Sequence, residues 1–119
     1  MTSRALVLGA VLFALGCAST VPISSVADLT GEWKGRISNP RGHAPAAMAI
    51  GADGGFRGTM FLEGGDQSFR GALVVVRPGQ VRYQGTDGNG TVRISEENGR
   101  RVLRFLRDDG GVDAVFQQF

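Results

Sequence analysis

From residue 28 to the C-terminus, apolar and polar residues alternate in short segments. In the first segment Trp33, Gly35 and Ile37 share one face, and charged residues occupy the other. A period of two with one apolar side is typical of a strand that has one face in a core and the other in water. The later segments place these residues on the apolar side: Met48 and Ile50; Phe56, Gly58, Met60 and Leu62; Phe69, Gly71, Leu73 and Val75; Val81 and Tyr83; Val92 and Ile94; Leu103 and Phe105; Val112, Ala114 and Phe116.

Clusters of glycine, asparagine, aspartate and proline separate these segments at intervals of about ten residues, the spacing of an antiparallel all-β domain. They lie at 39–42, 53–55, 64–66, 78–79, 87–90, 97–99 and 108–111. Glycine adopts positive φ freely, and asparagine and aspartate tolerate it, so such clusters favour tight hairpin turns. The sequence therefore predicts an all-β protein with an eight-stranded antiparallel up-and-down meander.

A meander of this length is expected to curl and close, because closure removes the two exposed edges of the sheet. The predicted architecture is a small closed barrel, and a β-sandwich is the alternative. Three inward positions hold glycine, namely Gly35, Gly58 and Gly71. We expect them to permit bending at a barrel corner, or to leave room beside a bulky neighbour such as Trp33.

The N-terminus has a different pattern. Arg4 precedes an apolar run at 5–16, which has small residues at its end, and Cys17 comes directly after the run. A charged start, a short apolar core and small residues are typical of a secretory signal peptide. The run is too short for a spanning helix, which takes about 20 residues. Ordinary secretion with cleavage nearby and a retained N-terminal segment are the alternatives.

The segment Ala14-Leu15-Gly16-Cys17 resembles the lipobox of bacterial lipoproteins, with Ala14 where leucine is usual. The resemblance implies that residues 1–16 are a signal peptide and that Cys17 is the lipidation site. Residues 17–27 are then the lipidated N-terminus and tether, and 28–119 form the barrel domain. Because Ala18 is not the aspartate that retains many such proteins at the inner membrane, the resemblance implies the periplasmic face of the outer membrane.

The segment Leu29-Thr30-Gly31-Glu32-Trp33-Lys34-Gly35 resembles the Gly-x-Trp start of the first strand in lipocalins and avidin-like proteins. These calycin-like families are eight-stranded up-and-down barrels. The resemblance implies that Trp33 packs as a plug at the closed end of the barrel. Contact between Trp33 and a ligand is the alternative.

Composition narrows the function. The chain has one cysteine, so the mature domain is stabilised without disulfides. The formal net charge of +2 includes Arg4, and acidic residues are interspersed with arginines, so no polybasic stripe emerges and nucleic acid is not a predicted partner. The one histidine, His43, has no clustered cysteines or carboxylates around it, and no serine lies in a Gly-x-Ser-x-Gly motif. We therefore predict neither enzymatic activity nor a metal or cofactor.

An inner face rich in aromatic residues predicts a barrel that is either filled or binds a small apolar ligand. Tyr83 is the inner aromatic with a polar group, so Tyr83 and Trp33 are the candidate ligand-binding residues. The alternative function is a periplasmic protein-interaction module: a protease or lysozyme inhibitor, or an accessory subunit of an envelope complex. The size resembles that of periplasmic protease inhibitors that are small barrels with a Gly-x-Trp strand. Four strand arginines are either a partner-facing surface or solvated faces: Arg57, Arg70, Arg82 and Arg93.

Overall fold

A computed structural model describes residues 19–20, 23–39, 42–86, 88–111 and 113–118. The predicted signal peptide, the predicted lipidation site Cys17 and the predicted inward residue Val112 lie outside the described residues.

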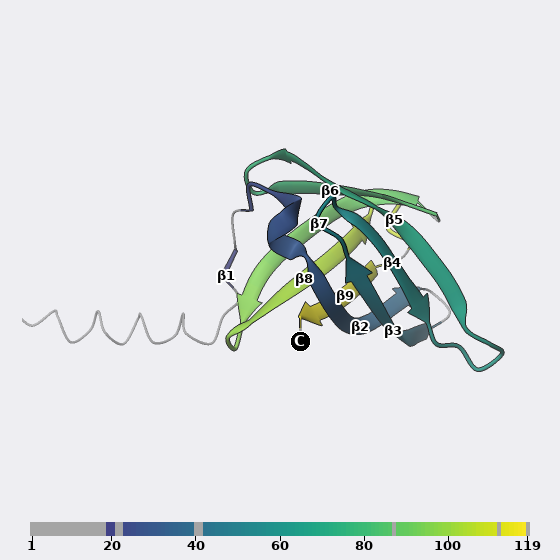
Figure 1. The fold of residues 1–119 in the computed structure, drawn as a ribbon. Helices are drawn as coiled ribbons and strands as arrows, with labels where there is room; N and C mark the ends of the chain where they lie inside the picture. Colours follow the sequence, from purple (N-terminus) through teal and green to yellow (C-terminus); the bar gives the residue numbers. More distant parts are fainter. Residues whose placement is uncertain (1–18, 21–22, 40–41, 87, 112, 119) are drawn as a thin grey trace, which may run out of the picture.

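Eight antiparallel strands form a closed up-and-down barrel (Figure 1). Each strand pairs with the next, and β9 pairs with β2 to close the ring. The predicted closed barrel is confirmed, and the β-sandwich alternative is wrong. The strands are β2 (Gly31–Asn39), β3 (Gly42–Ile50), β4 (Gly55–Met60), β5 (Gln67–Arg77), β6 (Gln80–Gly85), β7 (Gly88–Glu97), β8 (Arg100–Arg107) and β9 (Asp113–Gln118).

Two short elements precede the barrel. Strand β1 (Ser19–Thr20) pairs with β7 opposite Ser95 and Glu96, and the 3-10 helix η1 (Val26–Leu29) follows. Ile23 and Leu29 are both buried in the barrel's core cluster. The segment predicted as a tether is therefore partly docked on the barrel, and the packed unit begins before Asp28. Apolar residues at 23 and 29 were the signal for this docking.

The two ends of the barrel differ. The closed end is formed by the turns 51–54, 78–79 and 98–99, and η1 covers it beside Trp33. At the open end, β2 is followed by β3, β4 by β5, β6 by β7 and β8 by β9. In Figure 1, η1 and the connection between β4 and β5 lie at opposite ends of the barrel. Strand direction alone assigns each connection to its end, because successive strands alternate up and down.

The predicted inner face is confirmed for all six aromatic residues assigned to it. Inward glycines face several of these rings across neighbouring strands. A Cβ atom on Gly71 would lie 2.5 Å from Cζ of Phe56, and one on Gly58 would lie 2.5 Å from Cζ of Phe69. Gly58 and Gly71 therefore leave room for rings, as predicted, although the rings belong to phenylalanines rather than to Trp33. A Cβ on Gly35 would instead meet the backbone of Val115 and Phe116. The register pairs are Gly35 with Phe116, Gly58 with Phe69, Gly71 with Phe56, and Gly90 with Tyr83.

Two local predictions were wrong. Leu62 was expected on the inner face of a strand, but β4 ends at Met60 and Leu62 is 39% exposed in the connection. Residues 87–90 were expected to form a turn, but β6 ends at Gly85 and β7 already begins at Gly88. The reason is Gly90, which is buried in the strand because the ring of Tyr83 lies over it: a Cβ there would be 2.7 Å from Cε2.

Candidate functional site

A cavity of about 450 Å³ lies in the open half of the barrel. Its inner wall is mostly apolar and comes from strands around the whole ring. Polar side chains gather at the rim. The apolar lining residues are Ile37, Met48, Phe56, Met60, Phe69, Tyr83, Phe105, Ala114 and Phe116. The polar ones are Gln67, Ser68, Arg70, Thr86, Arg107 and Asp113.

The floor of the cavity is a cluster of aromatic rings centred on Phe105. Its ring centroid lies 5.8 Å from that of Phe56, 5.1 Å from that of Tyr83 and 5.8 Å from that of Phe116. All three pairs are edge-to-face, the arrangement that aromatic pairs prefer. Side chains therefore fill the barrel between these rings and the closed end, and the cavity lies between the rings and the open end. A ligand in the cavity would rest on aromatic surface.

Trp33 is not part of this cavity. Its side chain is fully buried towards the closed end, and its Nε1 donates a hydrogen bond to the carbonyl oxygen of Leu29 over 3.0 Å. The hydrogen bond satisfies the one polar atom of the indole, so the ring packs as an ordinary core residue. This is the predicted position of the plug. The second candidate, Tyr83, does line the cavity.

Tyr83 presents a neutral phenol to the cavity. Burial raises its pKa above the ordinary value, and the nearby guanidinium of Arg107 offsets part of that shift. Among the described residues, the Tyr83 hydroxyl has no hydrogen-bond partner. A half-buried donor without a protein partner is available to a polar atom of a bound molecule.

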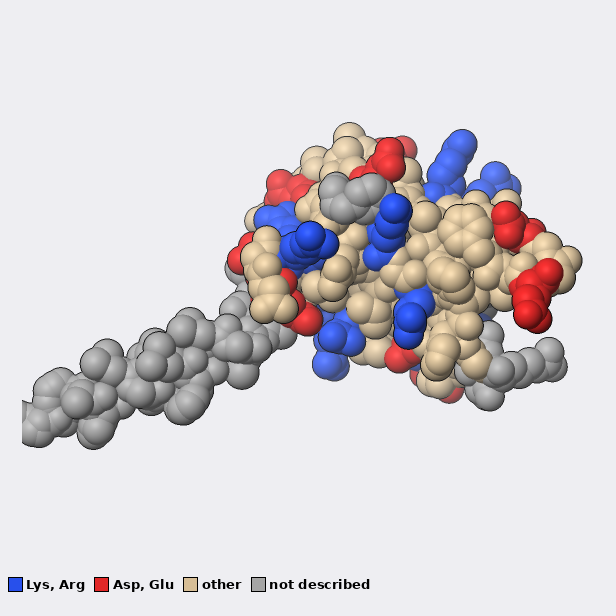
Figure 2. Space-filling view, turned by 90° about the horizontal axis from the view of Figure 1, so that it is seen from below, with Lys and Arg blue, Asp and Glu red and all other residues tan. Residues whose placement is uncertain are grey.

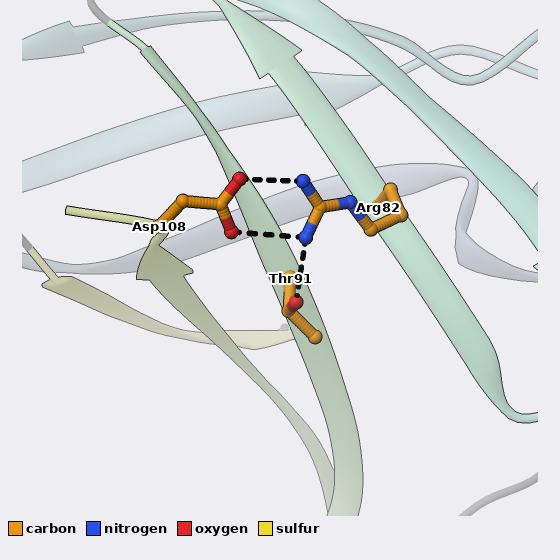
Figure 3. Close-up of polar contacts among 3 residues, drawn as sticks. All are labelled: Arg82, Thr91 and Asp108. Atoms are coloured by element: carbon orange, nitrogen blue, oxygen red, sulfur yellow. Dashed lines mark hydrogen bonds and ion pairs between the residues drawn. The ribbon is translucent and has the colours of Figure 1, made fainter. Parts of the chain in front are cut away.

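An ion pair links neighbouring elements of the barrel near the open end. The guanidinium of Arg82 contacts both carboxylate oxygens of Asp108, at 3.0 and 2.6 Å, and also donates to Oγ1 of Thr91 at 3.0 Å (Figure 3). This bidentate contact lowers the pKa of Asp108. The contacts join β6 and β7 to the connection after β8. The guanidinium of Arg82 therefore contacts groups of its own chain, in contrast to an arginine that is available to another protein.

The other predicted arginines are arranged differently. Arg57 and Arg70 lie directly opposite one another on β4 and β5, both exposed, and neither forms an ion pair with a described residue. Arg93 lies opposite Arg104, which pairs with Glu97 at 3.5 Å. On the face seen in Figure 2, basic and acidic side chains are both scattered. On that face no single-sign stripe stands out.

The described residues contain no group of three or more histidine, cysteine, aspartate or glutamate side chains that could hold a metal ion. His43 is exposed near the start of β3. In the same part of the chain, no helix is long and apolar enough to cross a membrane.

Comparison with known proteins supports the fold. Neither a protein-family model nor a curated protein matches the chain. One solved structure, a redesigned β-barrel, is similar with a TM-score of 0.57 and 12% sequence identity. The match covers 82% of this chain and 98% of that one. At this identity the likeness shows the barrel fold alone.

Sequence reasoning missed the polar rim of the cavity. Arg107 and Ser68 line it from strand ends, where hairpin register decides which way a side chain points. Alternation about the inward Phe69 places Ser68 and Arg70 on the outer face, so it gives no signal that the cavity reaches them at the strand end.

Proposed function

We propose that this protein is a lipid-anchored envelope lipoprotein whose barrel binds a small apolar ligand at its open end. The observation that carries the proposal is the cavity of about 450 Å³ with aromatic walls. Ligand pockets are typically about 300–1,000 Å³ and mostly apolar, with a few polar groups that orient the ligand. The cavity fits the lower part of that range, so the ligand is small.

The chemistry of the walls supports the same class of ligand. The floor of rings around Phe105 offers apolar surface, and burial of a ligand there would contribute about 25 cal/mol per Å² of apolar area. The hydroxyl of Tyr83 supplies one hydrogen-bonding group on the wall. In this proposal the protein has no catalytic role.

The anchor in this proposal is Cys17, and the location is the periplasmic face of the outer membrane. The lipobox resemblance supports it. Cys17 lies two positions before β1, whose pairing with β7 starts at Ser19. A lipid on Cys17 would therefore hold the barrel close to the membrane rather than on a long tether.

Filling the cavity tests the binding proposal. Ala114→Leu adds side-chain volume to a lining residue, and Ala72→Leu makes the same change on the exposed outer face of β5. A neutral fluorescent probe, N-phenyl-1-naphthylamine, should bind the wild type saturably. It should bind Ala114→Leu about tenfold more weakly and Ala72→Leu unchanged. Absence of saturable binding to the folded wild type, or equal binding to both variants, would overturn the proposal.

A protein-interaction module is the second candidate, and the connection between β4 and β5 favours it. Phe61 is 45% exposed and Leu62 is 39% exposed there. Adjacent exposed apolar side chains, such as these two directly after β4, can form part of a protein-binding surface. An affinity pull-down from the native envelope separates the candidates. A stoichiometric protein that is lost with Phe61→Ser/Leu62→Ser favours this one, and co-purified lipid favours ligand binding.

A further inference from the structure

We infer that the ligand of the cavity is a single-chain amphiphile with an anionic headgroup, phosphate or carboxylate, held outside the barrel by Arg57 and Arg70. The inference rests on the proposed ligand-binding function and adds the chemical class of the ligand. Its basis is a basic groove on the outer surface that shares lining residues with the apolar cavity, which gives a ligand a path from one to the other.

The path begins at a gap in the barrel wall. Strand β5 starts at Gln67, but its register with β6 starts only at Gly71. Beyond that pair, Thr86 continues the contact by donating its backbone N–H to the carbonyl oxygen of Arg70 at 3.0 Å. The first residues of β5 therefore pair with β4 alone, and the wall beside them is open towards the turn between β6 and β7.

A groove of about 510 Å³ lies on the outer surface at this gap. Four residues line both the groove and the cavity, namely Ser68, Phe69, Arg70 and Thr86. Phe69 is half-buried and lines both spaces. An acyl chain in the cavity would therefore leave the barrel across Phe69, and its headgroup would lie in the groove.

The groove has the chemistry of an anion site. Its polar lining consists of the guanidinium groups of Arg57 and Arg70 and of hydroxyl groups such as that of Thr59, and no described carboxylate lines it. Like charges directly opposite one another on a sheet are destabilising. These two have no acidic partner among the described residues. Guanidinium groups bind carboxylate and phosphate in a bidentate fashion, so an anionic headgroup would relieve the repulsion.

The charged residues at the rim of the cavity also favour an anionic headgroup on the β5 side. The carboxylate that lines the cavity is Asp113, on β9, which is opposite β5 in the ring of strands. Arg107 also lines the cavity, but its Nε contacts Oδ2 of Asp109 at 3.0 Å. A negative headgroup is therefore repelled from the β9 side, and the guanidinium of Arg70 is free to receive it.

Displacement of N-phenyl-1-naphthylamine by decyl phosphate, decanoate and decanol tests the inference. These compounds share one chain and differ in the headgroup. In the wild type, the two anions should bind about tenfold more tightly than decanol, as expected for charge-assisted hydrogen bonds at an exposed site. Arg57→Gln/Arg70→Gln should bring the anions to the level of decanol and leave decanol itself unchanged. Arg93→Gln, an exposed arginine outside the groove, should change nothing.

The outcomes separate this inference from the proposed function. Equal binding of decanol and decyl phosphate to the wild type, or anion binding that survives the double substitution, would overturn the inference while the cavity proposal stands. Effective displacement of decyl phosphate by inorganic phosphate would also overturn it, because the chain would then contribute nothing. If decanol and both anions all fail to displace the probe and the probe itself fails to bind, the proposed function fails as well.

Discussion

The indole N–H of Trp33 donates a hydrogen bond to the backbone carbonyl of Leu29, and the side chains of both residues are fully buried. This contact fastens η1 to the first strand of the barrel. It satisfies a carbonyl that would otherwise be buried next to apolar side chains. At the closed end, apolar packing is thus joined by specific polar contacts, which also include the hydrogen bond that Arg101 donates to the carbonyl oxygen of Asp28 at 2.9 Å.

Trp33→Phe should therefore destabilise the protein. The substitution leaves the Leu29 carbonyl without its donor, which costs about 1–3 kcal/mol, and the smaller ring leaves a cavity that adds to this. Urea unfolding followed by circular dichroism measures the loss. Phe61→Leu, a change at an exposed aromatic residue, should alter stability by less than about 0.5 kcal/mol. Equal stability of Trp33→Phe and the wild type would contradict the role of this contact.

Gly71→Ala should also be destabilising. The added Cβ would lie 2.5 Å from Cζ of Phe56 and 2.8 Å from Cα of Gly85, so the ring and the backbone must both move. Overpacking of this kind costs about 1–3 kcal/mol. Gly64→Ala is the matched control, because nothing lies within 4 Å of its Cβ. The midpoints of thermal unfolding of the two variants measure the difference. A Gly71→Ala protein as stable as Gly64→Ala would refute the packing argument.

The ion pair between Arg82 and Asp108 should appear in the pH dependence of stability. The pair lowers the pKa of Asp108 in the folded state. Its contribution is therefore present above the unfolded pKa of about 4 and is lost as pH falls through the lower folded value. Asp108→Asn should be slightly less stable than the wild type at pH 7 and equally stable near pH 2. The difference should shrink in high salt, because both groups are solvent-exposed.

Asp66→Asn is the control for this prediction. Asp66 is an exposed carboxylate that pairs with none of the described residues. Its substitution should leave the acid limb of the stability curve unchanged. If Asp108→Asn and Asp66→Asn give the same curve, the ion pair contributes nothing measurable.

Tyr83 offers a spectroscopic test of the cavity wall, because it is the single tyrosine of the chain. Its folded pKa is raised, chiefly by burial, so absorbance at 295 nm should report ionisation above the usual pKa of about 10. The unfolded state loses this proton first, so stability falls as pH rises from about 10 through the folded pKa. Tyr83→Phe should lack this decline. A folded-state midpoint at or below 10 would contradict the buried position.

Cys17→Ser tests the anchor. If Cys17 carries the lipid, labelled palmitate should be incorporated into the wild type and lost completely from the variant, which should move from the membrane to the soluble fraction. The barrel itself should be unaffected, because serine at 17 lies before the first paired residue, Ser19. Equal labelling of both proteins would remove the anchor from the proposal.

Much of the fold was predictable because two local patterns, the alternation of apolar and polar residues and the spacing of turn residues, indicate the same strands. Alternation identified the inner face, as with Leu73 and Phe105, and turn residues marked most reversals. At 98–99, Asn98 and Gly99 both adopt positive φ, of 53° and 80°, as a two-residue hairpin turn requires. The error at Leu62 has a physical cause: β3 continues to Gly42, but its Pro45, which accepts a hydrogen bond from the backbone N–H of Phe61, has no N–H to donate in return, so pairing with β4 stops at Met60. Only the neighbouring strand determines where pairing stops.

The site was less predictable, because it depends on contacts between distant segments. Arg82 and Asp108 are 26 positions apart, and nothing local in either segment identifies the other as a partner. The hollow above Phe105 depends on how rings from several strands share the interior. Tyr83 was identifiable from its polar group on an inward position. The opening beside Ser68 was not, because it arises from a difference in length between two strands.

The docked N-terminus has a consequence for the proposed anchor. Ser19 pairs with Glu96 near the closed end of the barrel, so a lipid on Cys17 would place the membrane at that end. Under this proposal the open end of the cavity would point away from the membrane. A ligand would then enter from the aqueous side and not from the leaflet that holds the anchor.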